Sequence, residues 1–308
     1  MITENAIVDI VYPYAKGKPD IFVSIGIVTP SEVLKICIGL DGKIRPVLNK
    51  TYEIGSITKS FVASLIVKLI GRGIISLSDY VREGITLEQL LTHSSGIKEY
   101  PLLQTGVDNP YSHITADDVI SYVSHTEKGA GDWEYSNTGF SLIGIYLSEK
   151  LKSPFSKVLE DFIKSTCNLQ STYIGYQGSD LLGHNGEHAF RWQWDKNSAF
   201  LPAGCLISSL DDMIQYLRLH MGSDMYQECH RKHLTTQMPF DMGLAFMRQR
   251  ETDIVFCMGL TEGFSSFIGF DSSKKYGVAV LSNYCGFGYG DKCTPNGIGF
   301  SILNDLLH

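Results

Sequence analysis

The sequence predicts an α+β fold: an antiparallel sheet built from both chain ends and flanked by helices, with a mainly helical lobe inserted between its halves. Short β-type runs bounded by turn signals occur before residue 40 and again after residue 240. Between about 80 and 200, the apolar residues recur mostly at helical spacing. The chain has 308 residues, 44% hydrophobic and 19% charged, which is enough apolar material for a substantial core.

We predict one domain over residues 1–308, with a sheet lobe at about 1–60 and 200–308 and a helical lobe at about 61–199. Its first elements are a short helix over 3–15 and strands over 21–29 and 33–39. A helix follows Ser56, because its apolar residues recur every three or four positions up to the glycines at 71 and 73.

The later elements follow the same reasoning. The central helices are expected over 87–91, 116–123, 140–151, 155–163 and 211–220. The C-terminal strands are expected over 243–248, 253–258, 265–270 and 276–282. Pro295-Asn296-Gly297 is a loop signal, and a closing helix is expected over 298–307.

Composition narrows the class of partner. The net charge is −7 without any basic cluster, which disfavours binding to nucleic acid or to an anionic membrane. The N-terminus lacks the pattern of a signal peptide, and no apolar run approaches the length of a membrane span. Seven scattered cysteines are typical of free thiols in a reducing compartment, so we expect a cytoplasmic protein. The oligomeric state is left open.

The most informative motif is Ser56-Ile57-Thr58-Lys59. Residues three apart share one helix face, so the lysine amine is expected to reach the serine hydroxyl. A serine becomes a good nucleophile when a neighbouring base takes its proton. Two other S-x-x-K matches, at Ser95 and Ser272, do not open a helix. The alternative is that Ser56 is only a helix cap.

A second motif, Tyr135-Ser136-Asn137, is the only Y-x-N in the chain and precedes an apolar helical run. Its phenol can pass a proton, and its amide can hold a substrate carbonyl or the lysine amine. The alternative is a capped helix start with Asn137 as the cap.

Five motifs in order carry a resemblance. They are Glu53 to Lys59, Leu90 to Ile97, Tyr135 to Phe140, Pro202 to Leu206 with Asp211 to Met213, and Gly263 to Phe267. Together they resemble the class C β-lactamase and penicillin-binding-protein-like serine hydrolase family, from about residue 20 to 285. That family includes peptidases, amidases, esterases and acyltransferases.

The resemblance implies roles for individual residues. Ser56 would be the nucleophile, Lys59 the base or proton relay, and Tyr135 the group that hands a proton to the leaving group. Asn137 would orient Lys59 and the substrate, and the backbone N–H groups of Ser56 and Leu260 would form the oxyanion hole. The resemblance implies no cofactor and no metal. His93 is interpreted as structural.

The chain departs from the family at one strand. Where members usually carry Lys-Thr-Gly or His-x-Gly, this sequence has Cys257-Met258-Gly259; the substrate site is expected to involve Cys257, Gly259 and Phe264. Without that cation, carboxylate substrates should bind poorly unless Arg191, Arg248 or Arg250 supplies charge, and Tyr135 should be less acidic. We therefore expect a hydrolase acting on a small ester or amide through an acyl-Ser56 intermediate, and a poor β-lactamase. Cys257 itself is interpreted as an inert small hydrophobe rather than a reactive thiol.

Other readings stay open. The same site would also serve an acyltransferase, or be silent in a binding protein of this fold. His184 to His188 fits H-x-x-E-H, a zinc-peptidase pattern, but its glycines favour a polar loop. Cys229 to His233 lacks the paired spacing of a zinc site and is interpreted as a solvated helix face.

Overall fold

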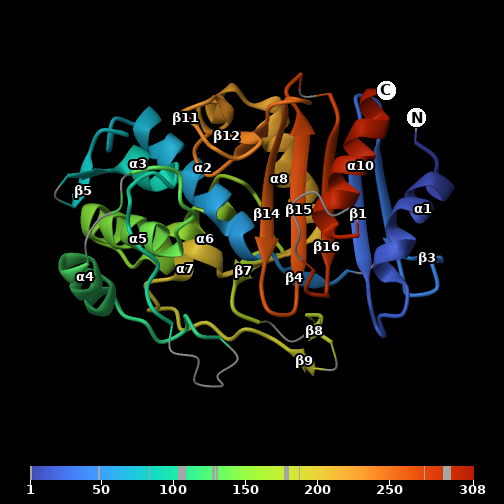
Figure 1. The fold of residues 1–308 in the computed structure, drawn as a ribbon, viewed down its shortest axis with the longest axis horizontal. Helices are drawn as coiled ribbons and strands as arrows, with labels where there is room; N and C mark the ends of the chain where they lie inside the picture. Colours follow the sequence, from blue (N-terminus) through green and yellow to red (C-terminus); the bar gives the residue numbers. More distant parts are fainter. Residues whose placement is uncertain are drawn as a thin grey trace.

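The computed structural model describes residues 2–47, 49–82, 84–102, 109–126, 129, 131–176, 180–186, 188–273, 275–286 and 293–308. A large antiparallel sheet stands between a helical layer on one side and two helices from the chain ends on the other (Figure 1). Helices and antiparallel strands from both chain ends share this one body. The predicted α+β class is therefore confirmed.

The large sheet joins the two ends of the chain. In spatial order its strands are β11 (Leu234–Thr235), β12 (Phe240–Met242), β13 (Met247–Gln249), β14 (Ile254–Leu260), β15 (Ser265–Asp271), β16 (Gly277–Ser282), β1 (Val23–Val28), β2 (Val33–Ile38) and β3 (Ile44–Arg45). The join is the antiparallel pairing of β1 with β16, in which Val23 lies opposite Ser282. Strands β1, β15 and β16 are buried along their whole length, which explains their almost continuous apolar runs.

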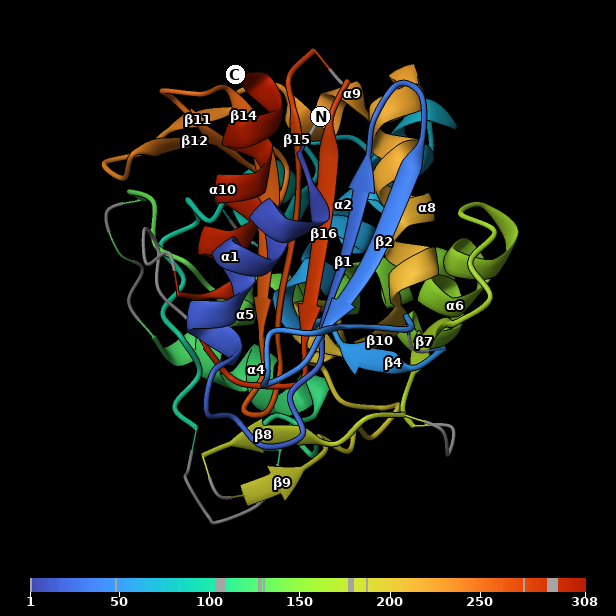
Figure 2. The same ribbon diagram turned by 90° about the vertical axis from the view of Figure 1, so that its right-hand side faces the viewer.

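Each face of the sheet has its own core. Helices α1 (Glu4–Ala15) and α10 (Pro295–Leu307) lie side by side over one face, with both termini at the same end of the molecule (Figure 2). Helix α8 (Leu210–Gly222) packs on the opposite face, so closely that a Cβ on Gly26 of β1 would lie 2.5 Å from the Ile214 side chain. The nucleophile motif belongs to this second face.

The other described residues build the helical part and three small sheets. Its helices are α2 (Thr58–Gly71), α3 (Leu87–Leu91), α4 (Ala116–His125), α5 (Asn137–Leu151), α6 (Phe155–Ser165), α7 (Leu201–Gly204) and α9 (Gln227–His230), with 3₁₀ turns η1 (Gly55–Ile57) and η2 (Asp224–Tyr226). The small sheets are β4 (Thr51–Glu53) with β10 (Leu206–Ser209) and β7 (Thr172–Ile174); β5 (Tyr80–Arg82) with β6 (Ile85–Thr86); and β8 (Gly183–Asn185) with β9 (His188–Phe190).

Three local predictions were wrong. The strand expected over 243–248 is reduced to β13, because Gly243 N donates instead to Phe246 O in a tight turn. The expected loop at Pro295 is the first turn of α10, where proline occupies a position that needs no N–H donor. His184 and His188 lie on the paired strands of a β-hairpin rather than in a loop.

Among the described residues, no helix combines the length and the apolar character needed to cross a membrane.

Candidate active site

Ser56 lies in the η1 turn, between strand β4 and helix α2. Two glycines let this turn approach the end of β14. Gly55 has a φ of +48°, in the left-handed region, and a Cβ on it would lie 2.7 Å from Leu260 N. A Cβ on Gly259 would lie 1.9 Å from Ile54 O. Small residues are therefore required on both sides of this contact.

Lys59 lies on the first turn of α2, where it is only 2% exposed. Its Nζ lies 3.0 Å from Ser56 Oγ, 2.8 Å from Asn137 Oδ1 and 2.6 Å from Ala203 O. Burial lowers the pKa of this amine to about 7, although Glu99 and the Cys257 thiol act in the opposite direction. The amine is therefore poised to gain or lose a proton near neutral pH.

Tyr135 completes the contacts of the nucleophile. Its hydroxyl donates to Ser56 Oγ at 2.6 Å. Burial of the phenol raises its pKa. The structure thus brings Ser56, Lys59, Tyr135 and Asn137 together from segments that lie far apart in the sequence.

His93 contacts the segment that carries Tyr135. Its Nδ1 accepts a hydrogen bond from Ser136 N at 3.1 Å, and its ring lies 4.5 Å from the Tyr135 ring, centroid to centroid. Burial and the nearby Lys59 charge lower the pKa of His93 to about 3, so the imidazole is neutral at physiological pH. A neutral ring that accepts at Nδ1 carries its proton at Nε2.

Glu99 is a site residue that the sequence analysis missed. Its carboxylate accepts four hydrogen bonds, two from Asn137 and two from Thr138, at the start of α5. Helix α5 begins at Asn137 with Ser136 as its cap, so the alternative that Asn137 is the cap was wrong. No spacing rule connects Glu99 with Asn137, because the two residues meet only through tertiary folding.

The backbone of Leu260 faces the nucleophile turn. Thr261 N donates to Phe264 O, so Thr261 and Phe264 form a hydrogen-bonded pair. Such pairs alternate with non-hydrogen-bonded pairs along antiparallel strands. Leu260, opposite Ser265, is in the next pair, so its N–H and C=O groups point away from β15. On its other side, β14 is paired with β13 only at Val255 and Phe256. The Leu260 N–H therefore points toward the η1 turn rather than into a strand ladder.

Two small cavities adjoin Ser56. One, of about 70 Å³, is walled by the aromatic rings of Tyr111, Trp192 and Trp194, with Leu260 on its border. The Tyr111 and Trp194 rings are stacked at 6.4 Å between centroids. The other cavity, of about 20 Å³, reaches Lys59, Tyr135 and Cys257. Aromatic clustering in the sequence around residues 190–194 was the available signal for the first cavity.

The buried carboxyl of Glu53 holds the aromatic wall in place. It is 4% exposed, and its Oε1 accepts from Trp192 N at 2.7 Å and from the Tyr176 hydroxyl. Burial raises the pKa of Glu53. A residue next to the nucleophile turn is thereby tied to the segment that forms the far side of the cavity.

The residues expected to bind substrate separate in the structure. Cys257 borders the smaller cavity, but its side chain is 2% exposed and its Sγ lies 3.4 Å from Ala245 O; burial raises the thiol pKa well above its usual value. Gly259 lies where β14 approaches the nucleophile turn, and it has no side chain to contact a substrate. Phe264 does not join the described lining of either cavity: it is 1% exposed and packs against the Tyr52 ring.

The three arginines considered as substitute cations are engaged elsewhere. Arg248 forms a two-point ion pair with Asp253, and Arg250 pairs with Asp241 at 2.9 Å. Arg191 donates to the backbone carbonyl groups of Asp180 and Leu181. None of the three belongs to the described lining of the cavities at Ser56.

The H-x-x-E-H motif does not form the helix that a zinc-peptidase pattern requires, because its two histidines lie on β8 and β9; Glu187 is outside the described residues. Within the described part of the chain, no group of three or more His, Cys, Asp or Glu side chains is arranged to hold a metal ion.

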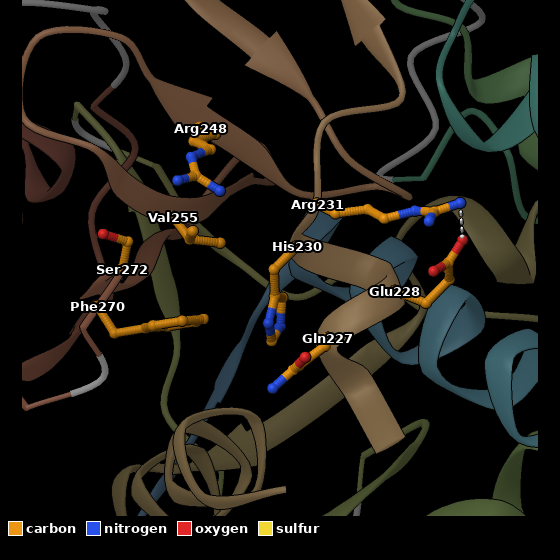
Figure 3. Close-up of a pocket in the computed structure, with 8 residues that line it drawn as sticks. All are labelled: Gln227, Glu228, His230, Arg231, Arg248, Val255, Phe270 and Ser272. Atoms are coloured by element: carbon orange, nitrogen blue, oxygen red, sulfur yellow. Dashed lines mark ion pairs between the residues drawn. The ribbon is translucent and has the colours of Figure 1, made fainter. Parts of the chain in front are cut away.

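A larger cavity, of about 380 Å³, lies between α9 and strands β13 to β15, and it shares no lining residue with the cavities at Ser56 (Figure 3). Its Arg231 extends toward Glu228, with which it pairs at 2.8 Å. The prediction of a solvated helix face here was wrong. Cys229 and His230 are buried, and His230 Nε2 lies 2.7 Å from Nδ1 of His220 on α8.

Comparisons with known proteins agree with this fold. The chain is 26% identical over 285 residues to protein flp of Staphylococcus aureus (strain MW2), covering 79% of this chain and 55% of that protein. The chain thus spans about half the length of the curated relatives it matches first.

Two solved structures are similar in fold. The octameric penicillin-binding protein homologue from Pyrococcus abyssi has a TM-score of 0.77 at 23% identity, covering 93% of this chain and 73% of that one. A class C β-lactamase from Rhodobacter sphaeroides has a TM-score of 0.78 at 19% identity, covering 93% and 95%. A sequence model described as β-lactamase matches residues 39–294, most of the chain. The chain therefore belongs to the β-lactamase family.

Proposed function

We propose that this protein is a serine hydrolase that cleaves a small, neutral ester or amide through an acyl-Ser56 intermediate. The observation that carries the proposal is the 3.0 Å contact between Ser56 Oγ and the buried Lys59 Nζ, whose pKa is lowered to about 7. A lysine with its usual pKa would be protonated at neutral pH and unable to act as a base.

Acylation begins when neutral Lys59 takes the Ser56 proton and Ser56 Oγ attacks the substrate carbonyl carbon. The negative charge that develops on the carbonyl oxygen is stabilised by the N–H groups of Ser56 and Leu260. Tyr135, 2.6 Å from Ser56 Oγ, relays the proton to the leaving alcohol or amine as its bond to the acyl group breaks. Water then attacks the acyl carbon and gives up its proton through the same groups, which releases the acid and restores Ser56.

The substrate class follows from what borders the nucleophile. The cavity walled by Tyr111, Trp192 and Trp194 has no cationic side chain in its described lining, and its volume of about 70 Å³ suits a compact apolar group. Cys257 replaces the usual cation, and Arg248 and Arg250 are paired elsewhere. These features favour a neutral acyl group and disfavour substrates that carry a carboxylate, penicillins among them.

A fluorophosphonate probe tests the nucleophile. Its phosphorus should bond to Ser56 Oγ with loss of fluoride, and the serine proton should pass to Lys59. Wild-type protein should gain the mass of one phosphonyl group, and Ser56→Ala should gain none. Ser95→Ala, which removes the serine of a second S-x-x-K match, is the matched control and should label normally. Failure of the wild type to label would favour a binding protein of this fold.

The substrate class is tested with neutral p-nitrophenyl esters, acetate and butyrate, beside the ester of succinic acid, which carries a free carboxylate. We expect kcat/KM for the neutral esters to exceed that for the succinyl ester by about tenfold or more, since one unpaired charge in an apolar site costs at least about 1.4 kcal/mol. Trp194→Ala should lower kcat/KM for butyrate more than for acetate. Equal rates on all three esters would contradict the proposed preference.

A further inference from the structure

We infer that Glu99 is a positioning residue that sets the orientation of the Asn137 side-chain amide, so that the amide oxygen rather than its nitrogen faces Lys59. The inference rests on the proposed function, because the orientation of this amide matters only if Lys59 takes the Ser56 proton. Glu99 Oε1 accepts from Asn137 N at 2.9 Å and from Asn137 Nδ2 at 2.8 Å. Its Oε2 accepts from Thr138 N at 2.9 Å and from Thr138 Oγ1 at 2.8 Å.

The chemistry of a carboxylate makes this contact directional. An ionised carboxylate only accepts hydrogen bonds, whereas the two ends of an amide differ in that one donates and the other accepts. Facing Glu99, the Asn137 amide must therefore present its nitrogen. The oxygen is then left on the opposite side, where it lies 2.8 Å from Lys59 Nζ. The N-terminus of α5 favours a negative charge at this place.

The orientation of the amide decides where the lysine lone pair points. A neutral amine has two N–H groups and one lone pair. Asn137 Oδ1 and Ala203 O, at 2.8 and 2.6 Å, accept the two N–H groups, and the remaining direction leads to Ser56 Oγ at 3.0 Å. A rotated amide would aim its NH₂ group at the amine and compete with the serine proton for that lone pair.

Glu99 is exposed, but its backbone is held on both sides. Its carbonyl accepts from the Tyr122 hydroxyl at 2.7 Å, and the next residue, Tyr100, donates its N–H to Thr138 Oγ1 at 2.7 Å. The carboxylate is therefore presented by an anchored segment rather than by a free loop. Among the described residues, the other titratable groups that act on this region are His93, Tyr111, Tyr135 and Cys257; the Tyr111 hydroxyl also accepts from Asn137 Nδ2, at 3.4 Å.

The test is the second-order rate of Ser56 labelling by the fluorophosphonate probe, measured across pH for wild type, Glu99→Gln and Glu134→Gln. The glutamine in Glu99→Gln keeps the shape of the side chain but places an NH₂ group against the donors of Asn137 and Thr138. We expect labelling of this variant to slow by about 10- to 100-fold, as misplaced catalytic groups do. The midpoint of its acidic limb should also move to lower pH, because Glu99 raises the pKa of Lys59.

Glu134→Gln is the matched control. Glu134 is an exposed carboxylate that pairs with Lys98, the residue before Glu99. It should keep the wild-type rate and midpoint. Each rate is divided by the concentration of folded protein, which is measured by a thermal melt of the same sample. This is needed because Glu99 also accepts from N–H groups at the start of α5, so its substitution can lower stability.

The outcomes separate the two claims. If wild type labels at Ser56 and Glu99→Gln labels at the same rate and midpoint, Glu99 is only a helix-terminus ligand and the inference is overturned. A slower rate in Glu99→Gln with no displacement of the midpoint would overturn it as well, since a loosened start of α5 that leaves Lys59 unaffected would give that result. If wild type itself fails to label, the proposed function falls, and this inference falls with it.

Discussion

The amine of Lys59 is the single group whose charge state controls the proposed chemistry. It is almost completely buried, and its three contacts to oxygen fix it in place. The pKa of this amine is lowered by loss of water rather than by a neighbouring cation. Its basicity therefore depends on the packing of the surrounding protein.

This predicts how activity depends on pH. Below the Lys59 pKa of about 7 the amine is protonated and cannot take the serine proton, so the rate of Ser56 acylation should fall as pH falls through about 7. Above that value the rate should level off. Lys59→Arg should lose about 10²- to 10⁴-fold in rate at all pH values, because arginine stays protonated. A rate that stays constant well below pH 7 would rule out Lys59 as the base.

Residue 257 is predicted to decide tolerance of a substrate carboxylate. Cys257→Lys restores a cation beside the cavity that contains Ser56, Lys59 and Tyr135. We expect faster acylation by a chromogenic cephalosporin relative to a neutral ester, because the new charge attracts the cephalosporin carboxylate. Cys257→Met, which adds length without charge, is the control. If this ratio does not change in Cys257→Lys, position 257 does not correspond to the family's cationic position.

At the scale of elements, the contact between β14 and the η1 turn places the two backbone N–H groups proposed as oxyanion donors. Gly259→Ala would put a methyl group where only 1.9 Å separates it from Ile54 O, so strand and turn must move apart. We expect a loss of about 1–3 kcal/mol in the free energy of unfolding and a slower labelling of Ser56. Both are measured on one preparation, by urea denaturation and by the fluorophosphonate probe.

The control for this prediction is Gly71→Ala at the end of α2. An added Cβ there meets nothing within 4 Å, so stability should be unchanged or rise by up to about 1 kcal/mol. If Gly259→Ala behaves like Gly71→Ala, the close approach of β14 to the nucleophile turn is not needed for either stability or chemistry.

At the scale of the whole molecule, the sheet separates two cores with different tasks. The face that carries α2 and α8 holds the candidate site, and the face that carries α1 and α10 is sealed by apolar packing. The Tyr14 hydroxyl on α1 is a buried polar exception: it lies 2.9 Å from Ser282 Oγ and donates to Tyr284 O at 3.0 Å. Burial raises the pKa of Tyr14 to about 12, so the phenol remains protonated.

Tyr14→Phe should therefore cost about 1–3 kcal/mol in the free energy of unfolding, because it leaves buried partners unsatisfied. Labelling of Ser56 per folded molecule should not change, since the sheet lies between this cluster and the nucleophile. Tyr12→Phe on the same helix, where the side chain is 38% exposed, should have little effect on either quantity. A parallel loss of labelling in Tyr14→Phe would show that the two faces are coupled.

Most of the elements could be predicted from the sequence because their signals are local. The apolar period behind Ser56 predicted α2, and the alternation of turns and β-type runs predicted β1, β2, β15 and β16. Predictions failed where a local signal has two meanings. Pro295 favours a loop or a first helical turn, and Cys229 to His233 looks polar although the fold buries much of it.

By itself, the sequence determined the fold class and the candidate nucleophile and base, because Ser56 and Lys59 lie within one helical turn and hydrophobic periodicity is a property of neighbours. Only the tertiary structure decided that Glu99 faces Asn137, that Glu53 holds Trp192, and that the candidate arginines turn away from the site. Glu99 and Asn137 are 38 positions apart in the sequence, and Glu53 and Trp192 are 139 positions apart. No local pattern encodes such distances, since they are set by how helices and sheet pack around a shared core.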